Sequence, residues 1–174
     1  MKIVILNSQG GAGKDTFYEY CKEWVSYVYH TSMVEGVKEI AEKNFGWRGG
    51  KEQKDRTLLM QIKDIWEEYN DGPFIDTCNR IRLIENELER YGLRSDAAVT
   101  FVDSRTPADI QRFVDKYGAT TVLLRRTEQE DKFTDRVDGD EVFDFKYDFI
   151  IDNNGSLEDL EQAAHTFMNF LLLN

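Results

Sequence analysis

The chain has 174 residues, of which 41% are hydrophobic and 13% aromatic, and its formal net charge is -11. This length and composition allow one buried hydrophobic core, which excludes a disordered protein. The negative charge repels phosphate backbones and anionic lipid headgroups, so it argues against binding to duplex nucleic acid or to a membrane surface. An anionic ligand must then bind where the few arginines and lysines gather.

Cysteine usage and apolar runs indicate the cellular setting. Cys21 and Cys78 are the only cysteines, and neither belongs to a disulfide or zinc-binding pattern. The apolar run at residues 3–6 is too short for a signal-peptide core, and no apolar stretch approaches the roughly 20 residues of a membrane span. We therefore expect a cytoplasmic protein with no membrane partner, and we leave a homodimer open.

The first half of the chain begins with a strand and continues mainly as helices. The apolar, β-branched run at residues 3–6 is typical of a strand buried in a parallel sheet. A glycine-rich turn over residues 8–13 leads into a helix, and a second strand is expected around residues 31–34. The apolar stripe expected for the first helix comprises Phe17, Tyr20, Cys21, Trp24 and Val28, and a short helix then runs through Val37, Ile40 and Ala41.

Helical spacing continues in the middle of the chain, and strands return after it. Long helices are predicted over residues 51–69 and 74–91, separated by the Asn-Asp-Gly-Pro stop at residues 70–73. A Ser156–Asp159 capping box predicts the start of a last helix. The remaining expected elements are strands over 98–102, 120–124 and 148–151, and a helix over 107–117. This alternation predicts an α/β, doubly wound, mostly parallel five-stranded sheet, in which ligands bind beyond the carboxyl ends of the strands.

A phosphate-binding loop is predicted directly after the first strand. Residues 8–16, Ser-Gln-Gly-Gly-Ala-Gly-Lys-Asp-Thr, stand close to the pattern G-x-x-x-x-G-K-[ST]. Glycines let backbone N–H groups turn towards phosphate oxygens, and the positive end of the next helix points at the same place. We therefore predict that ATP is bound by consecutive residues of this loop: Gly10, Gly11, Ala12, Gly13, Lys14, Asp15 and Thr16.

Two residues of this loop depart from the pattern. Ser8 replaces the first glycine, and Asp15 stands where a metal-binding Ser or Thr is usual. Thr16 can supply the missing hydroxyl, so Thr16 and Asp15 are candidate ligands for Mg²⁺. The alternative is a glycine-rich turn that binds nothing, but its position between a strand and a helix favours phosphate binding.

Polar residues also follow the strand at residues 98–102. Asp103 can hold Mg²⁺ through water or orient an acceptor, and Arg105 can pair with a phosphate. The alternative is a polar turn in which Asp103 caps the next helix.

These two segments resemble one family. The Gly-Lys-Asp-Thr loop at residues 13–16 resembles that of nucleoside monophosphate kinases, most closely the bacteriophage-type deoxynucleoside monophosphate kinases. The Asp-x-Arg-x-Pro stretch at residues 103–107 resembles the same group. The resemblance extends over nearly the whole chain and implies one P-loop NTPase domain of the nucleoside and nucleotide kinase type over residues 1–174. It further implies a helical acceptor-binding insert over about 36–92 and a lid over about 127–146.

The resemblance also implies roles for residues after the last two strands. Arg125 and Arg126 end the strand at residues 120–124, and Arg136 lies in the expected lid, where such kinases carry arginines that surround the transferring phosphoryl group. Asn153 lies in the loop that packs against the donor's adenine in similar kinases. Surface ion pairs for the arginines and a plain turn at Asn153 are the alternatives.

A second group of positive residues is a candidate site for the acceptor's phosphate: Lys38, Arg48, Lys51, Lys54 and Arg56. Arg56 is its preferred member, and we take Lys38 and Arg56 together with Asp103 and Arg105 as the acceptor-binding residues. Lysines that face solvent on an amphipathic helix are the alternative.

Together these features predict phosphoryl transfer from ATP, with Mg²⁺, to a small phosphorylated acceptor such as a (deoxy)nucleoside monophosphate. The expected catalytic residues are Lys14, Arg125, Arg126 and Arg136; the candidate metal ligands are Thr16, Asp15 and Asp103. Small-molecule nucleotides are the expected partners. Two alternatives remain: a kinase of the same architecture for another acceptor such as dephospho-coenzyme A, or a module that senses nucleotides with little turnover.

Overall fold

The computed structural model describes residues 1–8, 11–94, 98–126 and 141–173. The chain divides into two compact units, the first Met1–His30 with Gly92–Asn174 and the second Thr31–Tyr91, and each is described by itself. The second unit overlaps the predicted insert at residues 36–92; a single domain over residues 1–174 stays a prediction.

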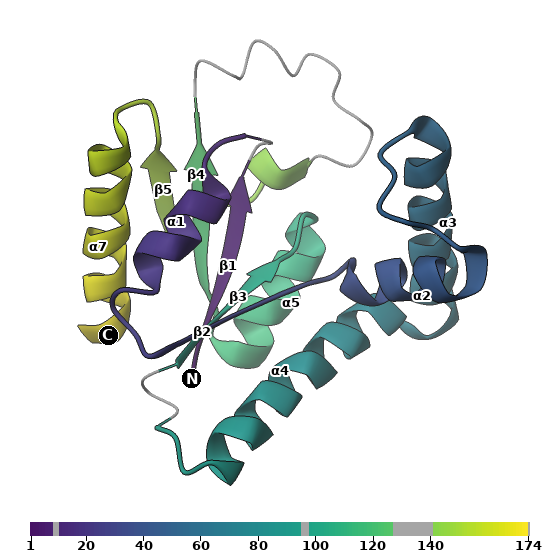
Figure 1. Ribbon diagram of the computed structural model, residues 1–174, viewed down its shortest axis with the longest axis horizontal. Helices are drawn as coiled ribbons and strands as arrows, with labels where there is room; N and C mark the ends of the chain where they lie inside the picture. Colours follow the sequence, from purple (N-terminus) through teal and green to yellow (C-terminus); the bar gives the residue numbers. More distant parts are fainter. Residues whose placement is uncertain (9–10, 95–97, 127–140, 174) are drawn as a thin grey trace. The chain divides into compact units, whose positions relative to one another are not determined.

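A five-stranded sheet forms the centre of the first unit (Figure 1). Its strands are β1 (Lys2–Ser8), β2 (Tyr27–Ser32), β3 (Ala98–Asp103), β4 (Thr120–Arg125) and β5 (Phe149–Asp152), in the order β2-β3-β1-β4-β5. The pairs β1–β3, β1–β4 and β4–β5 are parallel. The predicted α/β, five-stranded parallel architecture is confirmed.

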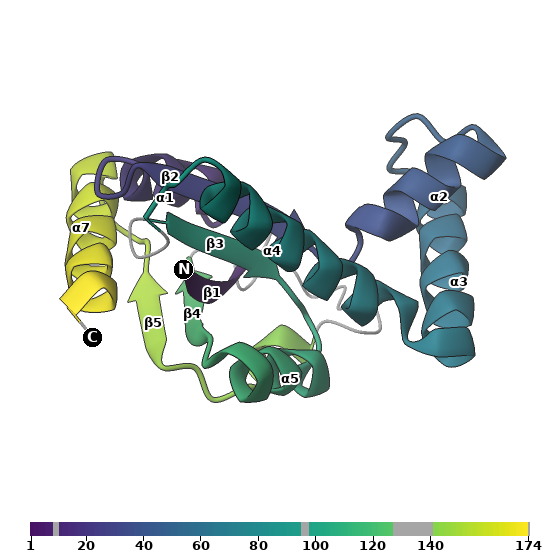
Figure 2. The same cartoon turned by 90° about the horizontal axis from the view of Figure 1, so that it is seen from below.

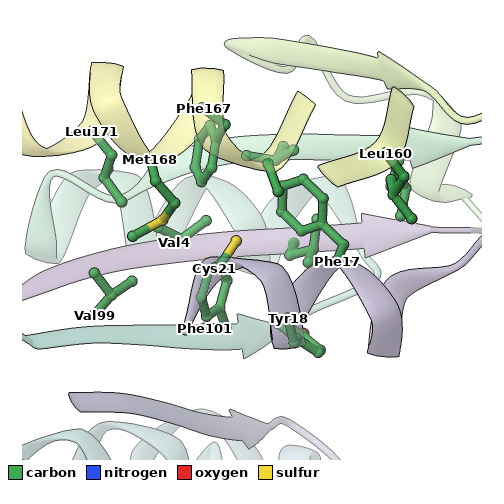
Figure 3. Close-up of a cluster of buried hydrophobic side chains, with 14 of the residues drawn as sticks. Val4, Phe17, Tyr18, Cys21, Val99, Phe101, Leu160, Phe167, Met168 and Leu171 are labelled. Carbon is green, nitrogen blue, oxygen red and sulfur yellow. The ribbon is translucent and has the colours of Figure 1, made fainter. Parts of the chain in front are cut away.

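Helices cover both faces of this sheet. Side chains alternate between the faces along each strand, so Val4 and Leu6 of β1 point to one face and join a buried cluster with residues of α1 (Lys14–Cys21) and α7 (Leu157–Leu173). Figure 3 shows Phe17 of α1 beside Phe167 of α7, and the centroids of the two rings are 5.9 Å apart. The helix α5 (Pro107–Tyr117) lies on the opposite face (Figure 2). Its Ile110 and Phe113 are fully buried.

The strand order fixes where the functional loops leave the sheet. β1 lies between β3 and β4, with Ile5 opposite Val102 and Ser8 opposite Leu124. The loops after these three parallel strands therefore emerge side by side at the carboxyl ends of the strands, where ligands bind in such sheets.

Two sequence predictions about the first unit were wrong. The first helix ends at Cys21 because the chain turns there, with the Trp24 amide bonded to the Cys21 carbonyl. Trp24 is 41% exposed, and Val28 lies on a strand, so neither extends a helical stripe. The second strand covers Tyr27–Ser32 instead of residues 31–34, since Val34 already caps the next helix.

The second unit consists of three helices, and their prediction was confirmed. They are α2 (Glu35–Phe45), α3 (Gln53–Asn70) and α4 (Gly72–Arg90). Asp71, at a left-handed φ of 59°, separates α3 from α4. A Cβ on Gly72 would lie 1.8 Å from Nε1 of Trp66, so the glycine permits the indole to pack against the start of α4. No helix in the described ranges is both long and apolar enough to cross a membrane.

Hydrogen bonds between Asp148 and Thr121 link the start of β5 to β4. The Asp148 Oδ2 atom accepts hydrogen bonds of 2.8 Å from both the amide and the hydroxyl of Thr121. The Asp148 amide donates to the Thr121 hydroxyl at 2.9 Å. Thr121 is buried, so losing its hydroxyl leaves the Asp148 amide without this acceptor in a place that water reaches poorly.

Replacing Thr121 by valine should therefore lower the free energy of unfolding by about 1–2 kcal/mol. Thr120→Val is the matched control, because Thr120 neighbours Thr121 on β4 and is less buried. Denaturant unfolding of both variants measures the difference. If both variants lose the same free energy of unfolding, the Thr121–Asp148 hydrogen bonds do not have this stabilising role.

Candidate phosphate-binding site

The turn between β1 and α1 has the backbone of an anion-binding site. Gly11 and Gly13 have φ angles of 78° and 93°, a left-handed conformation that favours glycine. Gly13 is the N-cap of α1 and has no side chain to bond the first-turn N–H groups. These N–H groups and the helix dipole can therefore serve a bound anion. The predicted ligand residue Gly10 lies outside the described residues.

Asn153 braces this turn from the neighbouring loop. Its side chain is buried, and its Nδ2 atom donates a 2.8 Å hydrogen bond to the carbonyl of Ala12. Its backbone amide donates to the Arg125 carbonyl, which links the loop after β5 to the end of β4. A Cβ on Gly13 would lie 2.6 Å from Asn153 Nδ2, so the two residues fit only with glycine at 13. The structure thus gives Asn153 a direct contact with the phosphate loop; an adenine contact stays a prediction.

An open pocket of about 310 Å³ lies at the start of α1. Its lining residues are Ser8, Gly11, Gly13, Lys14, Asp15, Thr16 and Arg105. The fold thus brings Arg105, from the loop after β3, to the same pocket as Lys14, Asp15 and Thr16. Ala12 is buried behind the loop, so only its backbone can take part in binding.

Asp103 connects three elements and contacts Lys14, which lines this pocket. Its Oδ2 atom lies 2.5 Å from Lys14 Nζ and 3.2 Å from His30 Nε2, while its Oδ1 atom accepts a 3.0 Å hydrogen bond from the Tyr18 hydroxyl. The rings of Tyr18 and His30 meet edge to face at 5.2 Å, and Tyr18 packs in the same way on Phe101. We call Lys14, Tyr18, His30 and Asp103 the Asp103 cluster.

The cluster keeps Asp103 ionised. Burial opposes the charged form, but the hydrogen bond from His30 and the charge of Lys14 outweigh it, so the pKa of Asp103 lies below its ordinary value. Burial, and then the neighbouring Asp103 charge, raises the pKa of Tyr18 well above its ordinary value. Both effects favour the protonated Tyr18 hydroxyl, which donates a hydrogen bond to Asp103.

Tyr18 and His30 were missing from the sequence predictions. His30 was placed before the second strand, whereas it lies on β2, beside β3. The chain has only two histidines, His30 and His165, and this scarcity was the one available signal.

Arg125, the last residue of β4, and Arg126 after it lie at the same carboxyl end of the sheet. Arg125 Nε and Nη2 both donate to the carboxylate of Asp152, the residue opposite it on β5, and Nη2 does so at 3.2 Å. This pairing lowers the pKa of Asp152. Arg126 follows the strand and is half-buried, whereas Arg136 lies outside the described residues.

The described part of the predicted lid is anchored at its end. Residues 127–140 lie outside the described residues, and Glu141–Phe143 form a short 3₁₀ helix. The Tyr147 hydroxyl donates to the Val142 carbonyl at 2.7 Å and accepts a 2.9 Å bond from Asn7 of β1. The lid itself stays a prediction.

The predicted acceptor residues Lys38 and Arg56 belong to the second unit. Both side chains are exposed, Lys38 on α2 and Arg56 on α3, where Arg56 Nε donates to the Lys51 carbonyl at 3.3 Å. Lys54 forms a 3.0 Å ion pair with Glu52, which suits the alternative of a solvated surface.

Comparison with known proteins bears on the fold. No protein-family model matches the sequence, and no curated protein matches it. Among solved structures, the protein TT1252 from Thermus thermophilus is 17% identical, with a TM-score of 0.53 over 98% of this chain and 97% of the other. The shikimate kinase of Aquifex aeolicus is 13% identical, with a TM-score of 0.50 over 100% and 99%. The fold is that of the P-loop kinases.

A dephospho-CoA kinase from Campylobacter jejuni is also similar, at 15% identity and a TM-score of 0.49 over 98% of this chain and 97% of the other. Identities this low concern the fold alone. The shared fold agrees with the resemblance described above, and membership of a particular kinase family, including the bacteriophage-type kinases, remains a proposal.

The hydrogen bond from Asn153 to the Ala12 carbonyl can be tested without a ligand. Asn153→Asp keeps the shape of the side chain but cannot donate to the Ala12 carbonyl. Losing this bond should speed amide exchange at Phe17, whose N–H bonds to the Gly13 carbonyl, by about tenfold, the equivalent of 1.4 kcal/mol. Hydrogen-exchange mass spectrometry over the first turn of α1 measures it. An unchanged exchange rate there would show that the loop keeps its shape without this hydrogen bond.

Proposed function

We propose that this chain transfers the γ-phosphoryl group of ATP to a small phosphorylated acceptor, with a (deoxy)nucleoside monophosphate as the leading candidate. The observation that carries the proposal is the pocket at the start of α1, where Lys14, Asp15, Thr16 and Arg105 surround uncapped helix N–H groups. The kinase fold supports it. So does the resemblance of residues 13–16 and 103–107 to bacteriophage-type deoxynucleoside monophosphate kinases.

The donor's phosphates would bind to the loop amides and Lys14. The amides and the helix dipole hold oxygen atoms in place, and Lys14 adds a charge that can follow the phosphoryl group. Arg105 lines the same pocket and can pair with a phosphate from either substrate. Since phosphoryl transfer needs little covalent help from the protein, this positioning supplies most of the catalysis.

The residues present fit a magnesium ion. Asp15 lines the pocket, and its carboxylate would repel phosphates unless a cation stood between them. The Thr16 hydroxyl and the carboxylates of Asp15 and Asp103 are the oxygen ligands that Mg²⁺ prefers. When bound, Mg²⁺ would neutralise the charge of the β- and γ-phosphates.

Charge that develops during transfer would be stabilised by arginines. Arg125 and Arg126 at the end of β4, with Arg136 from the expected lid, are the proposed residues. Lys38 and Arg56 are proposed to hold the phosphate of the acceptor. The proposed partners are nucleotides.

A second candidate has a hydroxyl acceptor, such as dephospho-coenzyme A. The observation that favours it is the ionised Asp103 beside Lys14, because a carboxylate next to the donor site can accept the proton of an attacking hydroxyl. A coupled ATPase assay over nucleoside monophosphates, deoxynucleoside monophosphates and dephospho-coenzyme A decides between the candidates. Stimulation by one class identifies the acceptor, and nucleotide binding without turnover on any of them would leave only a sensing module.

Lys14→Ala should lower kcat at least about 100-fold, because preorganised charge at the transferring group contributes several kcal/mol. Lys14 is partly exposed and outside the hydrophobic core, and Asp103 keeps its contacts with His30 and Tyr18, so the melting temperature should change little. Lys116→Ala on α5 is the control and should keep full activity. A folded Lys14→Ala protein with undiminished turnover would disprove the role of the loop.

Arg56→Ala should raise KM for the monophosphate about tenfold or more, and KM for ATP less than twofold, since one phosphate contact is worth at least about 1.4 kcal/mol. Lys63→Ala is the control on the same helix, because Lys63 pairs with Glu67 and is outside the candidate set. Steady-state kinetics with each substrate varied in turn measure both constants. If both KM values rise alike, or neither rises, Arg56 is an ordinary surface residue.

A further inference from the structure

The Asp103 carboxylate is shared between two nitrogen groups in the ligand-free protein. Oδ2 contacts both Lys14 Nζ and His30 Nε2, and the Asp103 side chain is only 23% exposed. A partly buried carboxylate loses much of its hydration, so each of these contacts replaces water that the folded chain excludes. When a ligand removes one of these contacts, the remaining contacts must still compensate the charge of Asp103.

Lys14 cannot serve Asp103 and a triphosphate equally well at the same time. The proposed function requires its ammonium group at the donor's phosphates, which are stronger attractants than one carboxylate. When Lys14 moves, Oδ2 loses its closest partner. His30 then remains on Oδ2, and the Tyr18 hydroxyl remains on Oδ1.

We propose that His30 is a positioning residue that keeps the Asp103 carboxylate solvated and in place when Lys14 moves from it to the donor's phosphates. The inference rests on the proposed function, because it needs a phosphate donor that takes Lys14. It adds a residue that neither the loop pattern nor the kinase resemblance contains.

The surroundings of His30 suit this role. A neutral imidazole with its hydrogen on Nε2 donates to a carboxylate, as a protonated one does, so the contact does not require a charged histidine. The Tyr18 ring, which packs on Phe101, supports the His30 ring from α1. The His30 side chain is 46% exposed, so replacing it removes little buried surface and should leave the fold intact.

Without His30, the exchange of partners becomes more costly. Lys14 would then be the main partner of Oδ2. When Lys14 moves to the phosphates of ATP, Oδ2 would lose this partner and, among the described residues, have no other nitrogen group in contact with it. His30→Ala should therefore weaken ATP binding by about tenfold, the equivalent of about 1.4 kcal/mol for one hydrogen bond to a charged group. The conservative variant His30→Gln, whose amide can still donate, should restore most of the affinity.

A double-mutant cycle tests this coupling. ATP binding is measured by calorimetry in EDTA, so that no metal ion competes for Asp103, in the wild type, His30→Ala, Asp103→Asn and the double variant. In the Asp103→Asn background the side chain has no negative charge and holds Lys14 only weakly, so His30→Ala should change affinity less than twofold. His165→Ala is the control, since His165 contacts Glu23 and Glu161 and lines neither pocket that contains Lys14.

The outcomes separate the inference from the proposed function. If the wild type binds ATP neither in EDTA nor with Mg²⁺, the proposed function falls and the inference falls with it. If it binds ATP only with Mg²⁺, the same cycle is measured with Mg²⁺ and read in the same way. If the wild type binds ATP but the effect of His30→Ala is absent, or equal in both backgrounds, only the inference is overturned. Coupling confined to the Asp103 background, with rescue by His30→Gln, supports it.

Discussion

The arrangement of this site depends on one partly buried carboxylate. Asp103 stands at the end of β3, and a charge in that position must be compensated by the chain itself because water has limited access. The compensation comes from α1 through Lys14 and Tyr18, and from β2 through His30. The requirement to solvate one residue therefore fixes the lysine of the phosphate loop, the edge strand and the neighbouring strand relative to one another.

The parallel sheet makes this meeting of distant segments possible. Because β1 lies between β3 and β4, the ends of three strands lie side by side, and β5 adds a fourth next to β4. Asn153, in the loop after β5, supports the predicted phosphate loop through its hydrogen bond to the Ala12 carbonyl. That support depends in turn on β5 keeping its register on β4, which the Thr121–Asp148 pair secures at the start of the strand. The shape of the loop is thus a property of the sheet and not of the glycines alone.

Most of the fold and part of the site could be predicted from the sequence, and the reasons differ by element. The strand at residues 98–102 was predicted from a short, mostly apolar run and the helix at residues 107–117 from the residues that follow it, and the structure has both elements with nearly these bounds. β2 was misplaced because Tyr27 and Tyr29 are only partly buried and His30 is exposed, so the strand lacks the apolar run of a central one. Residues 13–16 could be proposed as a site from the sequence because they are consecutive and form one recognisable pattern. The contact of His30 with Asp103 joins residues far apart in the chain, and nothing in the local pattern of either residue indicates the other.

The ion pairs of the site also bear on its selectivity. Lys14 is paired with Asp103 and Arg125 with Asp152, so two of the proposed ligand-binding cations already have carboxylate partners in a protein of net charge -11. Binding at these groups is therefore an exchange of partners, and a ligand gains only the difference between its own contact and the contact it replaces. A small anion that makes a single contact gains almost nothing from such an exchange. A triphosphate bound as proposed would offer several oxygens at once to Lys14, to the loop amides and to Arg105, and these contacts together would offset the loss of the Lys14–Asp103 pair. The internal pairing thus weakens binding of every anion by a similar amount, and only ligands that reach several groups together overcome it.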